Sequence, residues 1–322
     1  MDKVTLSAWP TPMEAAPRLA AEIGLAPDDL WIKRDDLTGL GGGGNKVRKL
    51  EWLVADALRC GADTLVTTGG PQSNHARLTA AAGARAGLDV VLVMPESGRP
   101  ERPGGNLLLD AALAARIVWA DAAGPAELTA HAATTCAELR EDGAVPYLVP
   151  FGGSSALGAR GYREAGAEIL AQQPGVRHVV TALGSGGTMA GLVAALGAER
   201  VLGVDVGALP DPATVAAAFA SKLTGREVTA GQLRVRGEQV GTAYGVLHEP
   251  VLAAITTVAR TEGVVLDPVY TGRAAAGLVA AVRDGGIRPG ERTVLLHSGG
   301  LPGLFGHAEA ADRLGRMLLT RP

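Results

Sequence analysis

The sequence predicts an α/β protein in which parallel strands are covered by helices. Apolar runs of strand length alternate with single helix-length segments along most of the 322 residues, and strands joined by one helix run parallel. Hydrophobic residues make up 47% of the chain but aromatic residues only 3%, a balance typical of parallel sheets under Ala-rich helices. The length favours two domains or one large α/β unit.

The first series of elements contains four expected strands, each followed or preceded by a helix. We expect strands at 64–68, 90–94, 116–119 and 147–149, and helices at 47–59, 74–86, 105–115 and 125–142. The glycine-rich segment at 150–155 then indicates a crossing between domains. The second series has expected strands at 178–182, 200–206 and 293–297, and helices at 158–172, 189–195, 210–223, 250–262 and 272–284.

Charge and composition narrow the classes of partner. The net charge is −3 with both signs scattered, which indicates neither a nucleic-acid surface nor a membrane surface and favours a small-molecule partner. No apolar run approaches the roughly 20 residues that span a bilayer, and the N-terminus lacks a signal-peptide pattern, so we expect a cytoplasmic protein. Cys60 and Cys136 have no metal-ligand spacing, and we expect reduced thiols and no metal site.

A lysine at the end of a glycine run is the first candidate for chemistry. Lys46 follows Gly41-Gly42-Gly43-Gly44-Asn45, and glycines without side chains allow a flat ligand to approach the backbone. A lysine amine in such a pocket can form a Schiff base with a carbonyl, as in enzymes that bind pyridoxal 5'-phosphate (PLP). The alternative is a flexible loop followed by a solvated, basic helix start.

A second glycine turn has the features of an anion site. Gly184-Ser185-Gly186-Gly187-Thr188 follows an apolar strand and opens a helix, so backbone N–H groups and the helix N-terminus can converge on a phosphate. The turn lacks the Gly-Lys-Ser/Thr ending of a P-loop and the Gly-x-Gly-x-x-Gly spacing of a dinucleotide site. A tight structural turn is the alternative.

Polar residues follow another strand at 72–75. Gln72, Ser73, Asn74 and His75 lie where open α/β sheets bind ligands. We expect Asn74 to donate to a phenolate oxygen of the cofactor and Ser73 to hold a substrate carboxylate, while capping of the helix is the alternative. His75 by itself is more typical of a structural helix residue than of a base.

The last candidates lie near the end of the chain. Tyr270 and Thr271 follow Asp267-Pro268-Val269; the phenol can move a proton or stack on a ring, and the Thr271 hydroxyl can face a ring nitrogen. Taken singly, each is more often a hydrogen-bonded loop residue. Ser298 begins a glycine turn after the last expected strand, which suits a position facing the cleft.

These motifs together resemble one enzyme family. Gly-Gly-Asn-Lys-Val-Arg-Lys-Leu-Glu around Lys46, residues 72–75, residues 184–188, Asp-Pro-Val-Tyr-Thr-Gly at 267–272 and His-Ser-Gly-Gly at 297–300 occur in one order. This order is similar to that of the D-cysteine desulfhydrase and 1-aminocyclopropane-1-carboxylate deaminase family. The resemblance implies the tryptophan-synthase-β-like PLP fold (fold type II), with the cofactor between two domains and usually a homodimer. It implies a large domain at 1–47 and 162–322 and an inserted small domain at 48–161.

The resemblance also implies residue roles. Lys46 resembles the Schiff-base lysine, Asn74 the partner of the ring hydroxyl, and residues Gly184, Ser185, Gly186, Gly187 and Thr188 the phosphate loop. Tyr244 and Tyr270 resemble the two active-site tyrosines, and Ser73 a residue that contacts substrate. Asn74, His75, Gly153 and Ser298 are expected beside Ser73 in the substrate site.

Two positions favour a desulfhydrase over a deaminase. Deaminases of the family have Glu after the tyrosine and Leu in the last strand turn, where this chain has Thr271 and Ser298. A neutral hydroxyl leaves the ring nitrogen mostly unprotonated and the electron sink weaker, which suffices when a thiolate leaves Cβ. We therefore expect a PLP-dependent carbon–sulfur lyase acting on D-cysteine. The alternatives are L-cysteate sulfo-lyase, the cyclopropane deaminase, and a non-catalytic phosphate- or nucleotide-binding protein.

Overall fold

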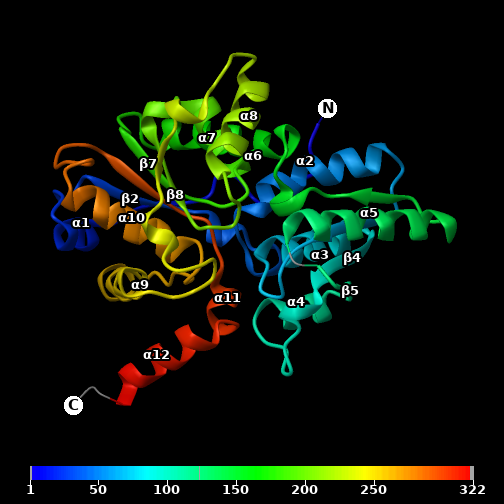
Figure 1. The fold of residues 1–322 in the computed structure, drawn as a ribbon. Helices are drawn as coiled ribbons and strands as arrows, with labels where there is room; N and C mark the ends of the chain where they lie inside the picture. Colours follow the sequence, from blue (N-terminus) through cyan, green and yellow to red (C-terminus); the bar gives the residue numbers. More distant parts are fainter. Residues whose placement is uncertain (1, 123, 320–322) are drawn as a thin grey trace.

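Two separate sheets organise the protein (Figure 1), whose computed structural model describes residues 2–122 and 124–319. In spatial order the smaller sheet comprises β5 (Arg116–Ala120), β4 (Asp89–Pro95), β3 (Thr64–Thr68) and β6 (Pro146–Leu148). The larger comprises β1 (Met13–Ala15), β2 (Leu30–Arg34), β10 (Thr293–His297), β7 (His178–Leu183), β8 (Val201–Asp205) and β9 (Arg234–Arg236). All pairings are parallel except that of β1 with β2, so the predicted α/β fold with two open sheets is confirmed.

Helices cover both faces of each sheet, as Figure 1 shows. On the smaller sheet, α2 (Lys46–Arg59) and α3 (Asn74–Ala86) share one apolar core, and α5 (Pro125–Glu141) packs on the other face. On the larger sheet, α1 (Pro17–Ile23), α9 (Glu249–Glu262) and α10 (Thr271–Arg283) cover one face, and α6 (Ala156–Gln172), α7 (Gly187–Leu196) and α8 (Pro212–Thr224) cover the other. The remaining α-helices are α4 (Asn106–Ala112), α11 (Leu301–Phe305) and α12 (Ala308–Leu319).

The sequence pattern predicted β3 to β8 and β10 but not β1, β2 and β9. β2 lies inside the larger sheet beside β10, yet it contains Lys33, which is fully buried. The Lys33 ammonium donates to Glu168 over 2.9 Å and to the carbonyl of Thr11 over 2.8 Å. A buried lysine interrupts the apolar pattern that marks a central strand, and this is why the sequence pattern missed β2. The lysine can be buried because Glu168 and Thr11 accept its hydrogen bonds.

Sheet membership supports the expected division into domains, which stays a prediction. All strands of the smaller sheet lie within 48–161, and those of the larger sheet lie outside it. Both expected boundaries fall inside helices, α2 and α6, which pack against each other. A Cβ on Gly161 would lie 2.2 Å from the carbonyl oxygen of Arg48, so the two helices cross at a distance that only glycine permits. Residues 1 and 320–322 of the expected large domain lie outside the described residues.

A buried ion cluster fixes the first turn of α2, which carries Lys46. The Arg48 guanidinium donates to Asp35 over 2.8 Å and to Glu168 of α6 over 2.8 Å, and it stacks 4.0 Å from the ring centre of Trp9. Burial alone would raise the pKa of Asp35, but the charge of Arg48 lowers it below its usual range. Because the pair is desolvated and fully hydrogen-bonded, it holds α2 and α6 in one relative position.

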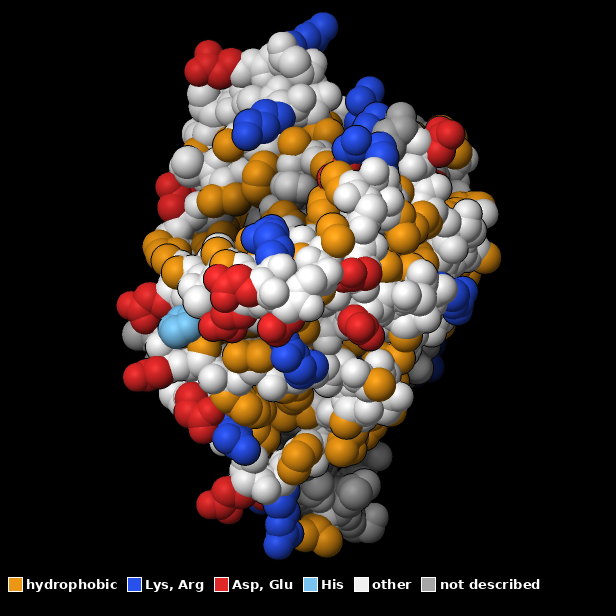
Figure 2. All heavy atoms as spheres, turned by 90° about the vertical axis from the view of Figure 1, so that its right-hand side faces the viewer, with side chains coloured by type: hydrophobic (Ala, Val, Ile, Leu, Met, Phe, Trp, Pro, Cys, Tyr) orange, Lys and Arg blue, Asp and Glu red, His pale blue; other side chains and the backbone are white. Residues whose placement is uncertain are grey.

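Acidic and basic side chains are interspersed over the face in Figure 2, with no large area of one sign. Within residues 2–122 and 124–319, no helix combines the length and apolar character needed to cross a bilayer. The same described residues contain no cluster of histidine, cysteine and carboxylate side chains that could hold a metal ion.

Candidate active site

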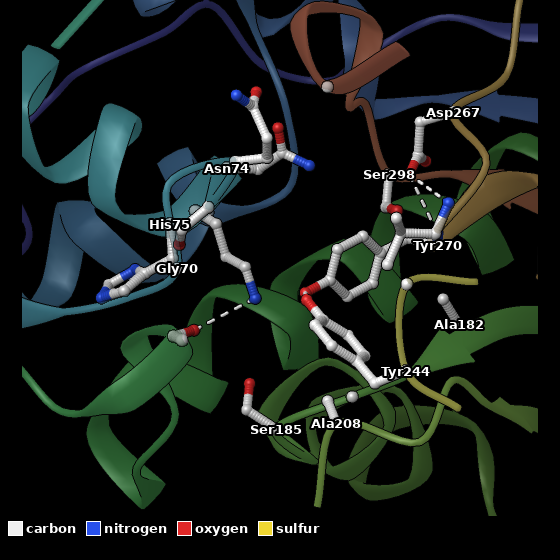
Figure 3. A pocket seen from close by; sticks show the side chains of 18 of the residues that line it. Gly70, Asn74, His75, Ala182, Ser185, Ala208, Tyr244, Asp267, Tyr270 and Ser298 are labelled. Carbon is white, nitrogen blue, oxygen red and sulfur yellow. Dashed lines mark hydrogen bonds between the residues drawn. The ribbon is translucent and has the colours of Figure 1, made fainter. Parts of the chain in front are cut away.

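A pocket of about 390 Å³ lies between the two sheets, next to the carboxyl ends of β3, β7 and β10. In Figure 3, Asn74 and His75 lie on one side of it, Tyr244 and Tyr270 on the other, and Ser185 at its base. Parallel strands bring the loops that follow them to one edge, which is why segments far apart in sequence meet here. The volume suits a cofactor with a small substrate.

Lys46 enters this pocket as the first residue of α2. The preceding turn needs glycine, because Gly43 has a φ of 76° and a Cβ there would lie 1.9 Å from the carbonyl oxygen of Asp36. The backbone N–H of Asn45 donates to the carbonyl of Ser298 over 2.9 Å, which ties the turn to the end of β10. The Lys46 Nζ donates to the carbonyl of Gly152 over 3.2 Å.

Burial makes the Lys46 amine unusually easy to deprotonate. Desolvation lowers the pKa of Lys46 to about 8, since the charged form loses its hydration. Lys49, one turn along α2, donates to the Ser154 hydroxyl over 3.0 Å. Burial and then the charge of Lys46 hold the pKa of Lys49 well below its usual range. A pKa of about 8 leaves a fraction of the Lys46 amine neutral near physiological pH, and the neutral form is the one that nucleophilic and base chemistry require.

The second glycine turn joins β7 to α7. Gly186 has a φ of 84°, and α7 begins at Gly187. The Ser185 and Ser154 hydroxyls lie 2.8 Å apart, and the Thr188 hydroxyl accepts from the Asn45 side chain over 3.1 Å. A Cβ on Gly187 would lie 3.1 Å from the Nζ of Lys49. The first-turn N–H groups of α7, the three hydroxyls and a lysine thus surround one small cradle.

Ser73 and His75 have structural partners at the start of α3. The Ser73 hydroxyl caps the helix by accepting from the N–H of Ala76 over 3.1 Å, and its own proton stays available. Thr67 gives its only hydroxyl proton to the Val149 carbonyl, so the His75 Nε2, 2.8 Å from that hydroxyl, donates to it. Burial, and then the charges of Lys46 and Lys49, hold the pKa of His75 well below its usual range.

The Asp267 carboxylate is fully occupied by its own loop. One oxygen accepts from the N–H and the hydroxyl of Thr271 over 2.8 and 2.6 Å, and the other from the N–H groups of Val269 and Tyr270, each over 2.9 Å. The Thr271 hydroxyl in turn accepts from the N–H of Asp267 over 2.8 Å. Asp267 lines the pocket, whereas Thr271 is buried behind it.

Arg273 and His307 both hold the loop that carries Tyr244. The buried Arg273 guanidinium, on α10, donates to the carbonyls of Val206, Ala243 and Val246 over 2.5, 3.1 and 2.9 Å. The His307 Nδ1 accepts from the N–H of Ala310, so its Nε2 donates to the Gly245 carbonyl, 2.6 Å away. Sequence reasoning missed both roles, because these partners lie 27 or more residues away in the chain.

Most of the sequence-predicted residues meet in this pocket. The lining includes Lys46, Ser73, Asn74, His75, Gly184, Ser185, Gly186, Thr188, Tyr244, Tyr270 and Ser298. Gly153, Gly187 and Thr271 lie outside the lining, and Gly152 takes the place expected for Gly153. The roles assigned to all these residues stay predictions. The lining also includes Lys49, Gln72, Gly152, Asp267 and His307, and all of these except His307 lie inside segments that already stood out in the sequence.

The family is shown by a match along most of the chain. Residues 4–299 match the family described as "Pyridoxal-phosphate dependent enzyme". This chain belongs to that family. The observed pocket fits PLP, because the cradle at 184–188 has donors for a phosphate and the Lys46 amine lies beside it with a lowered pKa. PLP is therefore the cofactor, and Lys46 and residues 184–188 would hold it.

Relatives with two different names are similar to this PLP-dependent enzyme. A protein of Pyrococcus abyssi named "Putative 1-aminocyclopropane-1-carboxylate deaminase" is 40% identical over 319 residues, covering 95% of this chain and 94% of the relative. The D-cysteine desulfhydrase of Salmonella typhi is 39% identical over 321 residues, covering 95% and 96%. Sequence identity alone therefore does not separate the two substrates.

Solved structures agree with this membership. The crystal structure of an ACC deaminase homologue has a TM-score of 0.87 and 37% identity, covering 97% of this chain and 96% of that one. A threonine deaminase from Solanum lycopersicum has a TM-score of 0.65 and 20% identity, covering 95% and 84%, and this likeness concerns the fold alone. The resemblance found in the sequence, and the PLP fold type II that it implied, are confirmed.

Proposed function

We propose that this enzyme is a PLP-dependent lyase that eliminates the β-substituent of a small amino acid, with D-cysteine as the substrate. D-Cysteine and water would give pyruvate, hydrogen sulfide and ammonia. The 39% identity to a D-cysteine desulfhydrase over nearly the whole chain supports this reaction class. The homodimer and the cytoplasmic location expected from the sequence belong to the same proposal.

The observation that carries the choice of substrate is the lack of a free carboxylate in the described pocket lining. Asp267 is the one carboxylate among those residues, and each of its two oxygens already accepts two hydrogen bonds. The position that holds Glu in the deaminases is Thr271, whose hydroxyl donates to Asp267. A ring nitrogen without a carboxylate partner stays largely unprotonated, which suits departure of a thiolate better than opening of a cyclopropane ring.

Lys46 is proposed as both the anchor of the cofactor and the base. PLP, when bound, supplies the electron sink for the pair left behind when Cα loses its proton. Lys46 Nζ, when its amine is free, would accept that proton, because its pKa of about 8 leaves a neutral fraction near physiological pH. The nearby Gly152 carbonyl, 3.2 Å from Nζ, would orient the amine.

Tyr244 and Tyr270 are proposed as proton donors to the leaving sulfur. Their hydroxyl oxygens lie 2.7 Å apart, so one hydroxyl donates to the other and one proton remains for the substrate. Burial raises the pKa of Tyr244, and burial followed by the neighbouring Tyr244 raises that of Tyr270 well above its usual range. Both phenols therefore stay protonated in the pH range of activity and can give a proton to the sulfur.

The charge of the pocket disfavours an anionic β-substituent such as the sulfonate of cysteate. No arginine is among the described residues that line the pocket, and the two lysines there already contact Gly152 and Ser154. A sulfonate would enter without a counter-ion of its own, whereas a thiol needs none.

Steady-state assays with D-cysteine, L-cysteine, L-cysteate and 1-aminocyclopropane-1-carboxylate test the proposal. We expect D-cysteine to give sulfide and pyruvate with the highest kcat/KM. Formation of 2-oxobutanoate from the cyclopropane substrate faster than release of sulfide would instead make the enzyme a deaminase. Sulfite release from cysteate as the fastest reaction would contradict the charge argument.

A further inference from the structure

Two buried polar side chains, Arg77 and Asn106, meet next to the Asn74 amide, outside the pocket lining. Arg77, one turn along α3, is fully buried. Its guanidinium donates to the carbonyls of Gly41 and Gly43 over 2.7 and 2.8 Å, to Asn106 Oδ1 over 3.0 Å, and to Asn74 Oδ1 over 3.3 Å. Asn74 is the only one of these contacts that lines the pocket, so Arg77 and Asn106 have no role in the reaction as described so far.

The chemistry of the partners fixes the orientation of the Asn106 amide. A guanidinium has donors but no acceptor, so the atom of Asn106 that faces Arg77 Nε must be the oxygen. The Asn106 nitrogen then faces the Gln72 carbonyl oxygen at 2.9 Å, which can only accept, and Asn74 Oδ1 at 3.0 Å. Its two protons thus have two acceptors, and the reversed amide would lose all three contacts.

The same reasoning fixes Asn74. Its oxygen accepts from Asn106 and from Arg77, so the other end of the amide, Nδ2, is left for the pocket that Asn74 lines. We propose that Arg77 and Asn106 are positioning residues that make Asn74 a fixed N–H donor toward an anionic oxygen on the cofactor ring. This rests on the proposed placement of PLP, with its ring hydroxyl beside Asn74.

A donor held in this way discriminates between ligands. A freely rotating amide would accommodate either a phenol or a phenolate, because it can present its oxygen or its nitrogen. Held by two donors on its oxygen, Asn74 presents N–H only and favours the deprotonated ring oxygen. A hydrogen bond to a charged oxygen changes affinity by about tenfold or more.

The affinity of the apoprotein for PLP, compared with its affinity for 3-deoxypyridoxal 5'-phosphate, tests this inference. The analogue lacks the ring hydroxyl, so the ratio of the two dissociation constants isolates the contact to that oxygen. We expect the wild-type protein to bind PLP about tenfold more tightly than the analogue. Equal affinities would overturn the inference.

Asn106→Asp is the sharpest variant. The substituted carboxylate keeps an acceptor for Arg77 Nε but removes both donors, so the Asn74 amide turns its nitrogen toward it and its oxygen toward the pocket. The PLP preference should fall to about onefold, and in an Asn74→Ala background Asn106→Asp should change the ratio no further. Arg77→Lys, which can still reach the glycine carbonyls but not both amides, should lower the preference in part.

Leu107→Ala is the matched control, since Leu107 is a buried core residue of the same helix that belongs to the apolar core under α3. It should lower Tm without changing the ratio. An unchanged ratio in Asn106→Asp, or an equal loss in Leu107→Ala, would reduce Arg77 and Asn106 to structural residues. The binding assay contains no amino-acid substrate, so the ratio of the two dissociation constants does not depend on which substrate the enzyme turns over.

Discussion

The hydroxyl oxygens of Tyr244 and Tyr270 lie 2.7 Å apart, and the two rings meet edge to face with centroids 6.4 Å apart. The Tyr244 ring is half exposed, whereas desolvation of its hydroxyl raises its pKa. One phenol comes from the loop before α9 and the other from the residue before α10. Because each hydroxyl is the other's partner, we expect the two phenols to act as a unit.

Removing either hydroxyl should therefore impair the same step. Tyr270→Phe and Tyr244→Phe should each lower kcat for elimination by roughly 10²- to 10⁴-fold, the usual size of a lost general acid. The double variant should be little slower than the worse single variant, because both changes remove one proton route. Steady-state kinetics on D-cysteine measure this, and effects that multiply would mean that the phenols act separately.

Arg273 should control Tyr244 without touching substrate. Arg273→Lys loses some of the three carbonyl contacts that hold the loop, so we expect kcat/KM to fall by about tenfold or more through misplacement of the phenol. Arg273→Met should also lower Tm, since buried carbonyls lose their donors. Arg283→Lys, exposed at the far end of α10, is the control, and equal kinetics for the two lysine variants would exclude a positioning role for Arg273.

The lowered pKa of Lys46 predicts how PLP uptake depends on pH. Only the neutral amine attacks a carbonyl, and burial lowers the pKa of Lys46 to about 8. The rate of PLP incorporation into the apoprotein should therefore rise with pH through a midpoint near 8, well below the midpoint of an ordinary lysine. Stopped-flow absorbance measures this rate, and a midpoint near 10.5 would show that the Lys46 amine is solvated.

Lys46→Ala provides the matching chemical test. It should fold and lose turnover by several orders of magnitude, because the anchor and the base are the same atom. Borohydride reduction followed by mass mapping should place the pyridoxyl adduct of the parent enzyme on Lys46. An adduct on Lys33, Lys49 or Lys222 would assign the cofactor to another lysine.

The phosphate position can be tested at Gly186. Gly186→Asp adds a negative charge at the turn before α7 and should weaken PLP binding, since the helix N-terminus then faces two anions. Gly186 has a φ of 84°, and a Cβ there would lie 3.1 Å from the backbone nitrogen of Ala216, so any side chain causes strain. Gly186→Ala is therefore the control for strain alone. Equal PLP affinities in equilibrium dialysis would mean that the phosphate binds elsewhere.

The sequence predicted those parts of the site that depend on local chain geometry. Lys46 and residues 184–188 stood out because a glycine turn followed by a helix start is visible in consecutive residues. Gly153 was expected in the pocket, but the lining contains Gly152, whose carbonyl accepts from Lys46. Which of two adjacent glycines faces a cavity depends on the backbone torsion angles, and these cannot be read from the local amino-acid sequence.

Contacts between distant residues were beyond the sequence. The sequence shows that residue 271 is a threonine. Whether its hydroxyl donates a hydrogen bond to Asp267 depends on how the loop closes, which the sequence does not show. Arg77 and Asn106 are 29 residues apart, and neither belongs to a motif. Such contacts are set by the packing of α3 against α4, which no local pattern records.

Thr271 and Ser298 together should decide between elimination of sulfide and ring opening. Thr271→Glu would place a carboxylate next to Asp267, at the position that holds Glu in the deaminases, where we expect it to raise the proton affinity of the ring nitrogen. Ser298→Leu would replace a polar group at the end of β10 with apolar surface that suits a hydrocarbon ring. We expect the double variant to lose D-cysteine elimination and to gain measurable formation of 2-oxobutanoate from 1-aminocyclopropane-1-carboxylate.

The controls separate charge from size. Thr271→Gln combined with Ser298→Leu has the same bulk without the carboxylate and should not open the ring, because the sink stays weak. Each substitution alone should do less than the pair, since the electronic and the shape requirements must be met together. If the parent enzyme already opened the cyclopropane ring faster than it released sulfide, Thr271 would not be the residue that sets the reaction. The hydrogen bond from Thr271 to Asp267 would then serve only to close the loop beneath Tyr270.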